Sequence, residues 1–448
     1  MTQPPNAFWH PMIHPHEMQS RAPLQIQSGD GVYVRDADGR TLLDGGAGLW
    51  CVNAGHNRKE IKEAIVRQLD ELEYFQIFAG LSHPRAAELA RMLMSFASVE
   101  NMKRAVFSSG GSDAIETALK LARQYHRLNG QPERTKFISL QHGYHGTHFG
   151  GTSITGNTVF RRYYEPLLPG CYHVTSPWQY RNPWTDDPEE LGRRCAAELE
   201  REIELQAPDT VAAFIAEPIQ GVGGVIVPPA NYWPLVRDVC NRHGVLLIAD
   251  EVITGFGRSG SMFGSRGWNV KPDMMCLAKG ISSAYIPLGA TLVNERIEQA
   301  FEANSDAAGA IMHGYTYSGH PVACAAAIAA LNIVERENLP ENARVQGEYL
   351  MKLLKPMEER FPSVGQVRGK GLMICIDLVA DKKTRQAVDP AGGLANRLAA
   401  ETRAAGVLVR AGGNKLILSP PLIFQASHCY ALAEALHAAF AKIDVGPA

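Results

Sequence analysis

The chain has 448 residues, too many for one compact core, so at least two subdomains are predicted. Its formal net charge of −2 gives no reason to expect nucleic acid or an anionic membrane as a partner. The eight cysteines show no C-x-x-C spacing, the N-terminus lacks a signal-peptide pattern, and no apolar run reaches the roughly 18–20 residues that span a bilayer. These features predict a cytoplasmic α/β protein with free thiols.

Short apolar runs alternate with amphipathic helical stretches along most of the chain. A hairpin around Asp38-Gly39 is predicted first, followed by a helix from about Arg58 to Leu72. The strands predicted after this helix are 105–107, 137–140, 211–216, 245–248 and 274–277. Their alternation with helices predicts a mostly parallel central sheet covered by helices. The Pro- and Trp-rich sequence 166–188 is expected to form a long surface insertion.

Lys279 and Asp250 are the most informative pair of residues. Lys279 follows the apolar run 274–278, so its amine is expected to lie away from water, where the neutral form that attacks carbonyls is favoured. Asp250 ends a run too apolar for a surface strand, and α/β proteins bind ligands at the carboxyl ends of buried parallel strands. A cofactor that needs a lysine on its carbonyl and an acid on its pyridine nitrogen is pyridoxal phosphate (PLP).

The segment from Ser109 to Ser112 follows the predicted strand 105–107 and opens an amphipathic helix. Its two glycines, Gly110 and Gly111, allow the backbone to approach an anion closely, and Ser112 is expected to cap the helix. The free N–H groups of a helix N-terminus attract phosphate. A capped strand-to-helix turn without a ligand is the plain structural alternative.

The segment 143–146 follows the strand 137–140, where the aromatic ring of Tyr144 could stack on a planar cofactor. A metal site is the alternative here, because His142, His145 and His148 have H-x-x-H-x-x-H spacing. The interspersed glycines argue against a helix that would bring these histidines together, so no metal is predicted.

A literal G-x-G-x-x-G motif spans residues 255–260. A nicotinamide-binding fingerprint requires these glycines directly between a strand and a helix, with an acidic residue about 20 positions later. Five residues separate Ile248-Ala249 from Gly255, no amphipathic helix follows, and Asp273 comes too early. The motif therefore does not indicate a dehydrogenase.

Taken together, these segments resemble the class III (subgroup II) PLP-dependent aminotransferases of fold type I. The resemblance extends from Trp50 to Pro421. The matching segments, in chain order, are 109–112, 143–146, Glu217-Pro218 with Gly221, 250–252 through 255–258, 278–280 and 313–321. The resemblance implies an α/β fold with a mostly parallel sheet and a smaller α+β domain. Residues 58–320 would form the large PLP-binding domain and 321–448 the small domain, with 1–57 joining the small domain and the active-site rim.

The resemblance also implies roles for individual residues at the cofactor. Lys279 would form the Schiff base with PLP and then transfer the substrate proton. Asp250 would keep the pyridine nitrogen protonated, and Glu217 would lie behind the ring. Tyr144 would stack on one face of the ring, and Val252 would support the other face.

The phosphate and the second subunit complete the implied cofactor site. Gly110, Gly111 and Ser112 would hold the phosphate, and Ser109 and His145 belong to the same matching segments. This chain reads Gly-Gly-Ser-Asp where the family pattern is closer to Ser-Gly-Ser-Glu, which leaves the hydroxyl of the first serine unreplaced. Tyr315 and Thr316 would reach the phosphate from the partner subunit, which implies a homodimer, with association into a tetramer left open.

Within the family, the segments 48–51 and 409–413 are similar to the ω-amino acid or amine:pyruvate transaminases. In that branch Trp50, Phe78 and Tyr144 would line the substrate pocket, and Arg410 would form a forked pair with the carboxylate of the 2-oxo acid acceptor. Core aromatics and a surface arginine are the structural alternatives. The expected reaction is ping-pong transfer from an ω-amino acid or primary amine to pyruvate, giving an aldehyde or ketone and L-alanine.

Three other activities remain open from the sequence. Two are transaminases, namely a 2-oxoglutarate-dependent enzyme of the 4-aminobutyrate or ornithine type and the diaminopelargonate-forming enzyme. The third is a PLP-dependent decarboxylase or racemase on the same scaffold, because the cofactor site alone does not fix which bond breaks.

Overall fold

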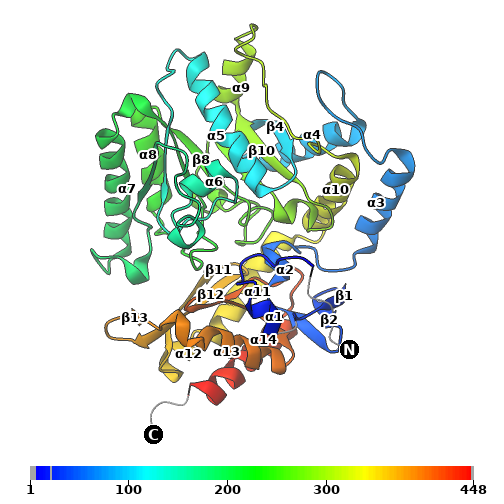
Figure 1. Ribbon diagram of the computed structural model, residues 1–448, viewed down its shortest axis with the longest axis vertical. Helices are drawn as coiled ribbons and strands as arrows, with labels where there is room; N and C mark the ends of the chain where they lie inside the picture. The colour runs from blue at the N-terminus through cyan, green and yellow to red at the C-terminus, as the bar shows by residue number, and fades with distance from the viewer. Residues whose placement is uncertain (1–6, 21–22, 445–448) are drawn as a thin grey trace.

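The larger part of the computed structural model, which describes residues 7–20 and 23–444, is a seven-stranded sheet in the order β4-β10-β9-β8-β7-β5-β6 (Figure 1). The strands are β4 (Met102–Ser108), β5 (Lys136–Leu140), β6 (Cys171–Val174), β7 (Val211–Ala216), β8 (Leu246–Asp250), β9 (Met274–Leu277) and β10 (Gly289–Asn294). Only β10 runs against its neighbours, and the other strands are parallel. The predicted mostly parallel α/β sheet is confirmed.

Helices cover both faces of this sheet. Along one face lies α5 (Gly111–Leu128), which packs on alternate strand residues such as Ile215 and Ile248. The opposite face is covered by α7 (Pro188–Leu205) and α8 (Tyr232–His243) at one end and by α4 (Pro84–Phe96) and α10 (Pro321–Arg336) at the other. Because both faces are buried, the strands read as continuous apolar runs in the sequence.

A smaller sheet, in the order β11-β12-β16-β15, lies below the large one in Figure 1. Its strands are β11 (Val364–Lys370), β12 (Met373–Asp381), β15 (Arg410–Gly412) and β16 (Lys415–Leu418), and β13 (Gln386–Ala387) pairs with β12. One face packs on α11 (Leu339–Leu354), α13 (Leu394–Ala404) and α14 (Ala426–Ile443). The other face contributes Met373, Cys375 and Ile417 to a cluster with residues of the large part.

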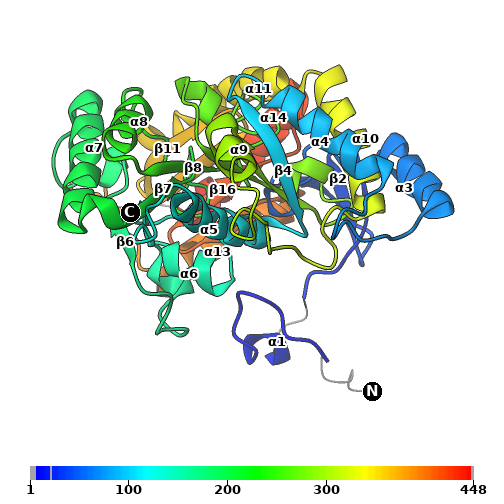
Figure 2. The ribbon, with the colours of Figure 1, turned by 90° about the horizontal axis from the view of Figure 1, so that it is seen from above.

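The N-terminal strands join the C-terminal part of the chain. The strands β1 (Ile26–Asp30), β2 (Tyr33–Asp36) and β3 (Thr41–Asp44) form the predicted hairpin region, and β14 (Val407–Leu408) pairs with β3 in parallel. The domain boundaries themselves stay a prediction. Figure 2 shows the segment that carries α1 (Glu17–Ser20) lying apart from the rest of the molecule.

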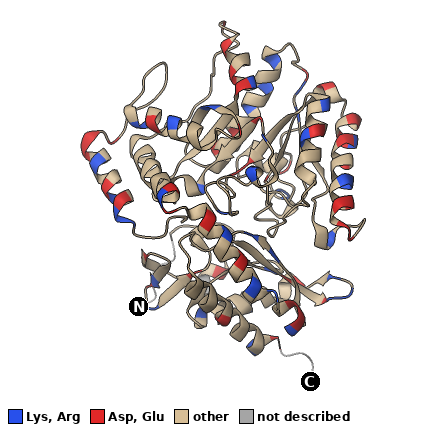
Figure 3. Ribbon diagram, turned by 180° about the vertical axis from the view of Figure 1, so that it is seen from behind, with Lys and Arg blue, Asp and Glu red and all other residues tan. Residues whose placement is uncertain are grey.

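The remaining helices are short, apart from α3, and several connect the strands. They are α2 (Ala47–Trp50), α3 (Lys59–Glu71), α6 (Phe149–Ile154), α9 (Glu295–Glu302) and α12 (Met357–Arg360), with 3-10 turns η1 (Thr158–Phe160), η2 (Gln179–Arg181), η3 (Pro208–Thr210), η4 (Ser265–Trp268), η5 (Lys279–Ser282) and η6 (Pro390–Gly392). Acidic and basic residues are interspersed along the helices (Figure 3). Within residues 7–20 and 23–444, no helix is long and apolar enough to cross a membrane.

The prediction that 166–188 is a surface insertion was wrong. Residues 171–174 form β6, the edge strand of the large sheet, and Trp178 is buried. The prolines on either side of β6 masked it, because an edge strand is short and tolerates such neighbours.

Candidate active site

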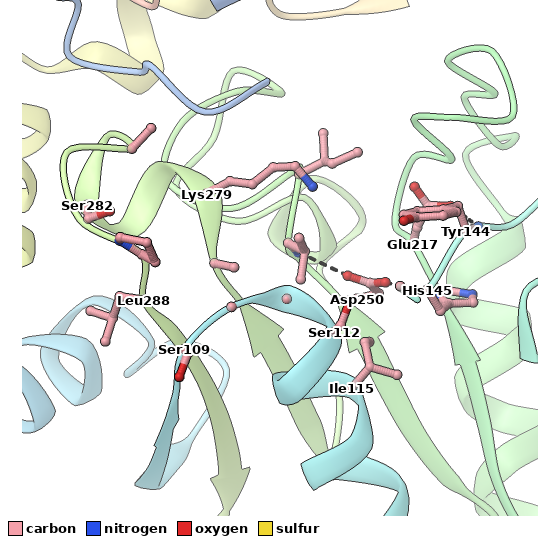
Figure 4. A pocket seen from close by; sticks show the side chains of 18 of the residues that line it. Ser109, Ser112, Ile115, Tyr144, His145, Glu217, Asp250, Lys279, Ser282 and Leu288 are labelled. Atoms are coloured by element: carbon pink, nitrogen blue, oxygen red, sulfur yellow. Dashed lines mark hydrogen bonds and ion pairs between the residues drawn. The ribbon is translucent and has the colours of Figure 1, made fainter. Parts of the chain in front are cut away.

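Five loops meet at one edge of the large sheet, where its parallel strands end. Lys279 follows β9, Asp250 ends β8, and Glu217 follows β7. The segments 143–146 and 109–112 follow β5 and β4. Because carboxyl ends of parallel strands lie at the same edge, these segments converge on one cavity of about 330 Å³ (Figure 4). The structure thus brings together the predicted residues Ser109, Gly110, Gly111, Ser112, Tyr144, His145, Glu217, Asp250, Val252 and Lys279.

Lys279 projects into this cavity from the start of η5 (Figure 4). Its backbone φ is +47°, in the left-handed region that costs a non-glycine residue about 1–2 kcal/mol. Burial lowers the pKa of the Lys279 ammonium, and the negative charge of Asp250 opposes part of that shift. The site therefore favours the neutral amine that can act as a nucleophile or a base.

Asp250 is buried and held by two hydrogen bonds. Its Oδ2 lies 2.7 Å from Nδ1 of His145, and its Oδ1 accepts the N–H of Val252 at 3.1 Å. His145 is itself fixed, because its backbone N–H donates to Oγ1 of Thr155 at 3.0 Å. These bonds orient the carboxylate toward the cavity (Figure 4).

Glu217 holds the loop that carries Tyr144. Its Oε1 accepts the N–H of Tyr144 at 3.2 Å, and its Oε2 accepts the N–H of Gly221 at 2.7 Å. Burial raises the pKa of Glu217, with Asp250 adding to the rise and His145 opposing it. The ring of Tyr144 packs edge-on against Phe160, with centroids 5.0 Å apart. Phe160 was missed in the sequence, because its loop carries no motif.

The N-terminus of α5 forms the opposite end of the cavity. Gly110 is the N-cap residue and no side chain caps the helix among the described residues, so backbone N–H groups remain free for a ligand. The prediction that Ser112 caps α5 was wrong, because Ser112 lies inside the first turn and its Oγ accepts the N–H of Thr147 at 3.1 Å. A Cβ on Gly111 would lie 2.9 Å from Val252, so only glycine fits there.

These residues have the donor set that PLP requires. Lys279 offers an amine for its carbonyl, and Asp250 a carboxylate for its pyridine nitrogen. The uncapped N-terminus of α5 suits its phosphate, and Tyr144 and Val252 supply side chains for its ring.

Of the predicted substrate residues, Tyr144 lines the cavity, whereas Arg410, Trp50 and Phe78 do not. Arg410 is half-buried on β15. Burial lowers the pKa of its guanidinium, and an electrostatic interaction with Tyr144 partly offsets this shift. Trp50 is only 2% exposed and packs with Ile253, which does line the cavity. Phe78 is 42% exposed and contacts the backbone near Gly314. The lining residues that carried no sequence signal are mostly apolar neighbours of the motifs, namely Ile115, Ile253, Ser282, Ala284, Ile286, Pro287 and Leu288.

Tyr315 and Thr316 lie outside the cavity of their own chain. The Tyr315 hydroxyl donates to the carbonyl oxygen of Asp113 at 3.2 Å. Thr316 is exposed, and its carbonyl oxygen accepts a hydrogen bond from the Tyr74 hydroxyl at 2.8 Å. Their contribution to a partner's phosphate site stays a prediction.

The histidine motif is dispersed in the fold. His142 packs edge-on against Trp178, His145 bonds to Asp250, and Nε2 of His148 lies 2.6 Å from Asp113. Within the described residues, no group of three or more His, Cys, Asp or Glu side chains could hold a metal ion.

The G-x-G-x-x-G motif forms a structural turn. The buried carboxylate of Glu251 accepts the N–H groups of Gly264 and Ser265 at 2.7 Å each. From within the turn, the buried guanidinium of Arg258 donates to Asn53 Oδ1 at 2.8 Å. Arg258 also donates to the carbonyl oxygens of Leu372 and Pro420, so the motif joins the N-terminal and C-terminal segments to the large sheet.

Comparisons with known proteins agree with this site. The family Aminotransferase class-III matches residues 15–440. Putrescine–pyruvate aminotransferase of Pseudomonas aeruginosa is 39% identical, over 90% of this chain and 87% of that protein. Diaminobutyrate–2-oxoglutarate transaminase of Halomonas elongata is 39% identical, over 89% and 86%. The PLP-bound crystal structure of an amine transaminase from an uncultivated Pseudomonas species is 57% identical, with a TM-score of 0.96, and the match covers 98% of this chain and 99% of that one.

The match extends over nearly the whole chain, and it explains why an amine, a carboxylate and an uncapped helix N-terminus meet in one cavity. The substrates of such an enzyme are an amine donor and a keto acid acceptor. The chain belongs to the class-III aminotransferases and is a PLP-dependent transaminase of fold type I.

Proposed function

We propose that the enzyme transfers the amino group of an ω-amino acid or primary amine to pyruvate by a ping-pong mechanism, giving an aldehyde or ketone and L-alanine. The names of two similar proteins, a putrescine–pyruvate aminotransferase and an amine transaminase, support this choice of substrates. The single observation that carries the proposal is the environment of Arg410.

Arg410 is a half-buried cation, and among the described residues no carboxylate pairs with its guanidinium. Burial lowers the pKa of Arg410, and the interaction with Tyr144 raises it. The pKa of Lys279 is lowered by burial and, in turn, by the positive charge of Arg410. A half-buried guanidinium whose charge acts on the reactive amine suits a substrate carboxylate, which it can bind through two hydrogen bonds.

The residues of the cavity divide the chemistry between them. Once bound, PLP supplies an electron sink for the charge that develops at the reacting carbon. Asp250, oriented by His145, holds a proton at the pyridine nitrogen. Lys279 Nζ, whose lowered pKa favours the neutral amine, would remove a proton from the donor carbon and pass it on within the first half-reaction, and would deliver a proton to the acceptor carbon in the second. Tyr144, backed by Phe160, shields one side of the site from water.

The second candidate acceptor is 2-oxoglutarate, favoured by the name of the Halomonas enzyme. The same arginine could bind either acid, since both carry a carboxylate next to the keto group. The two acceptors differ by a second carboxylate. No arginine among the described residues lines the cavity, and the choice of pyruvate is supported by the name of the putrescine–pyruvate aminotransferase.

Absorbance of the holoenzyme tests the donor and the acceptor separately. We expect the yellow colour of the enzyme to bleach on addition of at least one of β-alanine, 4-aminobutyrate, taurine, putrescine or an aromatic amine. Pyruvate should then restore the colour faster than 2-oxoglutarate does, with alanine formed in equal amount. Restoration by 2-oxoglutarate alone would identify the second candidate, and no bleaching by any donor would contradict the proposed substrates.

Replacement of Arg410 by alanine should act on one half-reaction. Loss of a charged, forked hydrogen bond should lower kcat/KM for pyruvate roughly ten- to hundredfold, while the reaction of a donor without a carboxylate changes little. Half-reaction rates measured from the absorbance of the cofactor check this expectation. Arg403→Ala, at a half-buried arginine near the end of α13, is the matched control. Equal losses for donor and acceptor would remove Arg410 from the acceptor site.

We also propose that the active enzyme is a homodimer with shared sites. Two hydrogen bonds link the loop that carries Phe78 to the loop that carries Thr316, so that they form one unit. The Tyr74 hydroxyl donates to the carbonyl oxygen of Thr316, and His83 Nε2 lies 2.6 Å from the carbonyl oxygen of Gly319. Phe78 and Thr316 are exposed and do not line the cavity of their own chain, and we expect both to enter the site of a second copy. A holoenzyme that sediments only as single chains would contradict the dimer.

A further inference from the structure

One face of the small sheet lies against the large part of the molecule, and Arg410 belongs to that face. Arg410 on β15 pairs with Ile417, and Ile417 in turn pairs with Cys375 on β12. Cys375 pairs with Arg368 on β11. Directly paired residues point to the same side of a sheet, so these four residues form one row. Arg368 therefore lies at the opposite end of the row from Arg410.

The next row of this face contains a carboxylate shared between the two parts of the molecule. Asp377 is 0% exposed. Its Oδ2 lies 2.9 Å from Nη2 of Arg368, on the same sheet. Its Oδ1 lies 2.7 Å from Nη2 of Arg181, in η2 of the large part. Asp377 thus joins a cation from each side of the junction.

Further contacts bind the same groups across the junction. Nε of Arg368 donates to the carbonyl oxygen of Gly224 at 2.8 Å, in the loop after β7. The ring of Trp178 faces three cations, with the guanidinium carbons of Arg368 and Arg181 at 4.9 and 5.7 Å and Nζ of Lys415 at 5.5 Å from its centroid. Cations over an indole face attract it, and more strongly where water is excluded.

The space between this junction and Arg410 is filled. Cys375 and Ile417, the middle residues of the row, pack with Trp50, Val225 and Ile253 in one buried cluster. Packed interiors transmit displacement because they hold few voids. A shift of Arg368 and Asp377 relative to the large part therefore carries β16 and β15 with it, and Arg410 moves relative to Tyr144 and Lys279.

We infer that the Arg181–Asp377 pair positions Arg410 and thereby tunes the enzyme for acceptors that carry a carboxylate. Neither residue lines the cavity, so both act through Arg410 as positioning residues. The inference rests on the proposed role of Arg410 at the acceptor. A donor without a carboxylate does not use Arg410, and its half-reaction is independent of the pair.

Arg181→Gln in the holoenzyme tests the inference with limited risk to folding, because Asp377 keeps its pair with Arg368. We expect kcat/KM for pyruvate to fall on the order of tenfold, mainly through KM, as for a small misplacement of a binding group. The half-reaction of benzylamine or putrescine should stay within about twofold of wild type, since no misplaced group contacts these amines. Amide hydrogen exchange over 407–418 should be faster than in wild type, while exchange over β7 and β8 is unchanged.

Arg237→Gln is the matched control. Arg237 and Asp273 are 14% and 5% exposed and lie 2.9 Å apart, compared with 20% and 0% for Arg181 and Asp377, but both belong to the large part. This variant should leave the ratio of pyruvate to benzylamine rates at the wild-type value. Asp377→Asn should reproduce the Arg181→Gln ratio with a larger loss, because it removes the charge from both arginines.

The outcomes separate this inference from the proposed function. Unchanged pyruvate kinetics and exchange in Arg181→Gln, with pyruvate impaired in Arg410→Ala, would overturn the inference and leave Arg410 at the acceptor. Equal losses for pyruvate and benzylamine would also overturn it, as a general structural effect. If Arg410→Ala spares pyruvate, the proposed acceptor site fails, and exchange over 407–418 still decides whether Arg181 holds β15 and β16 in place.

Discussion

Lys279→Ala is expected to abolish turnover, with a loss of at least on the order of 10⁴-fold, because no other amine lines the cavity to move the substrate proton. The cofactor should remain partly bound without a covalent link, since the N-terminus of α5 and Asp250 are unchanged. Turnover and the PLP content after gel filtration measure the two effects separately.

Lys271→Ala, at an exposed lysine before β9, is the control and should behave as wild type. Thermal melting of Lys279→Ala should show an intact fold, because alanine keeps the Cβ and thus leaves both the backbone strain at positive φ and the surrounding packing unchanged. Full transaminase activity in Lys279→Ala would show that another group carries the proton.

Asp250→Asn is expected to lower kcat on the order of 10²–10³-fold, as for the loss of one preorganised charge at the reacting centre. The amide has the same shape and can still bond to His145, so the fold and the cavity should survive. What is lost is the negative charge that we propose holds a proton at the pyridine nitrogen. Half-reaction rates with donor and with acceptor should fall together, in contrast to Arg410→Ala.

Asp238→Asn, at an exposed position of α8, controls for the change of residue type. A melting temperature and PLP content close to wild type would show that the loss in Asp250→Asn is chemical. Activity within a few-fold of wild type would mean that a different acid faces the pyridine nitrogen.

The sequence was sufficient to predict most of the large sheet and to identify the residues that meet at the carboxyl ends of its strands. The strands β7, β8 and β9 are buried on both faces and therefore read as unbroken apolar runs, which fixed the positions of Asp250 and Lys279 at their ends. Glycine at position 111 was also informative, because a close approach of backbone to Val252 permits no side chain there.

Other features depend on contacts between distant segments and leave no local pattern. Ser112 resembles a helix cap in the sequence, but the N-cap of α5 is Gly110, two residues earlier, and Asp113 accepts the N–H of Ser109 at 2.9 Å. Phe160 packs on Tyr144, and Arg181 pairs with Asp377. No fixed spacing in the sequence relates the partners of either pair. Such pairs become visible only in three dimensions.

The single antiparallel strand of the large sheet has a consequence for the order of folding. β10 lies between β4 and β9, so the strand that leads to Gly110 meets the strand that leads to Lys279 only through residues 289–294. Contacts between segments far apart in the chain close large loops and form slowly. During synthesis, β4 and α5 leave the ribosome long before β10 exists. The strand β4 therefore joins the large sheet only after residues 289–294, which follow Lys279 in the chain, have been made.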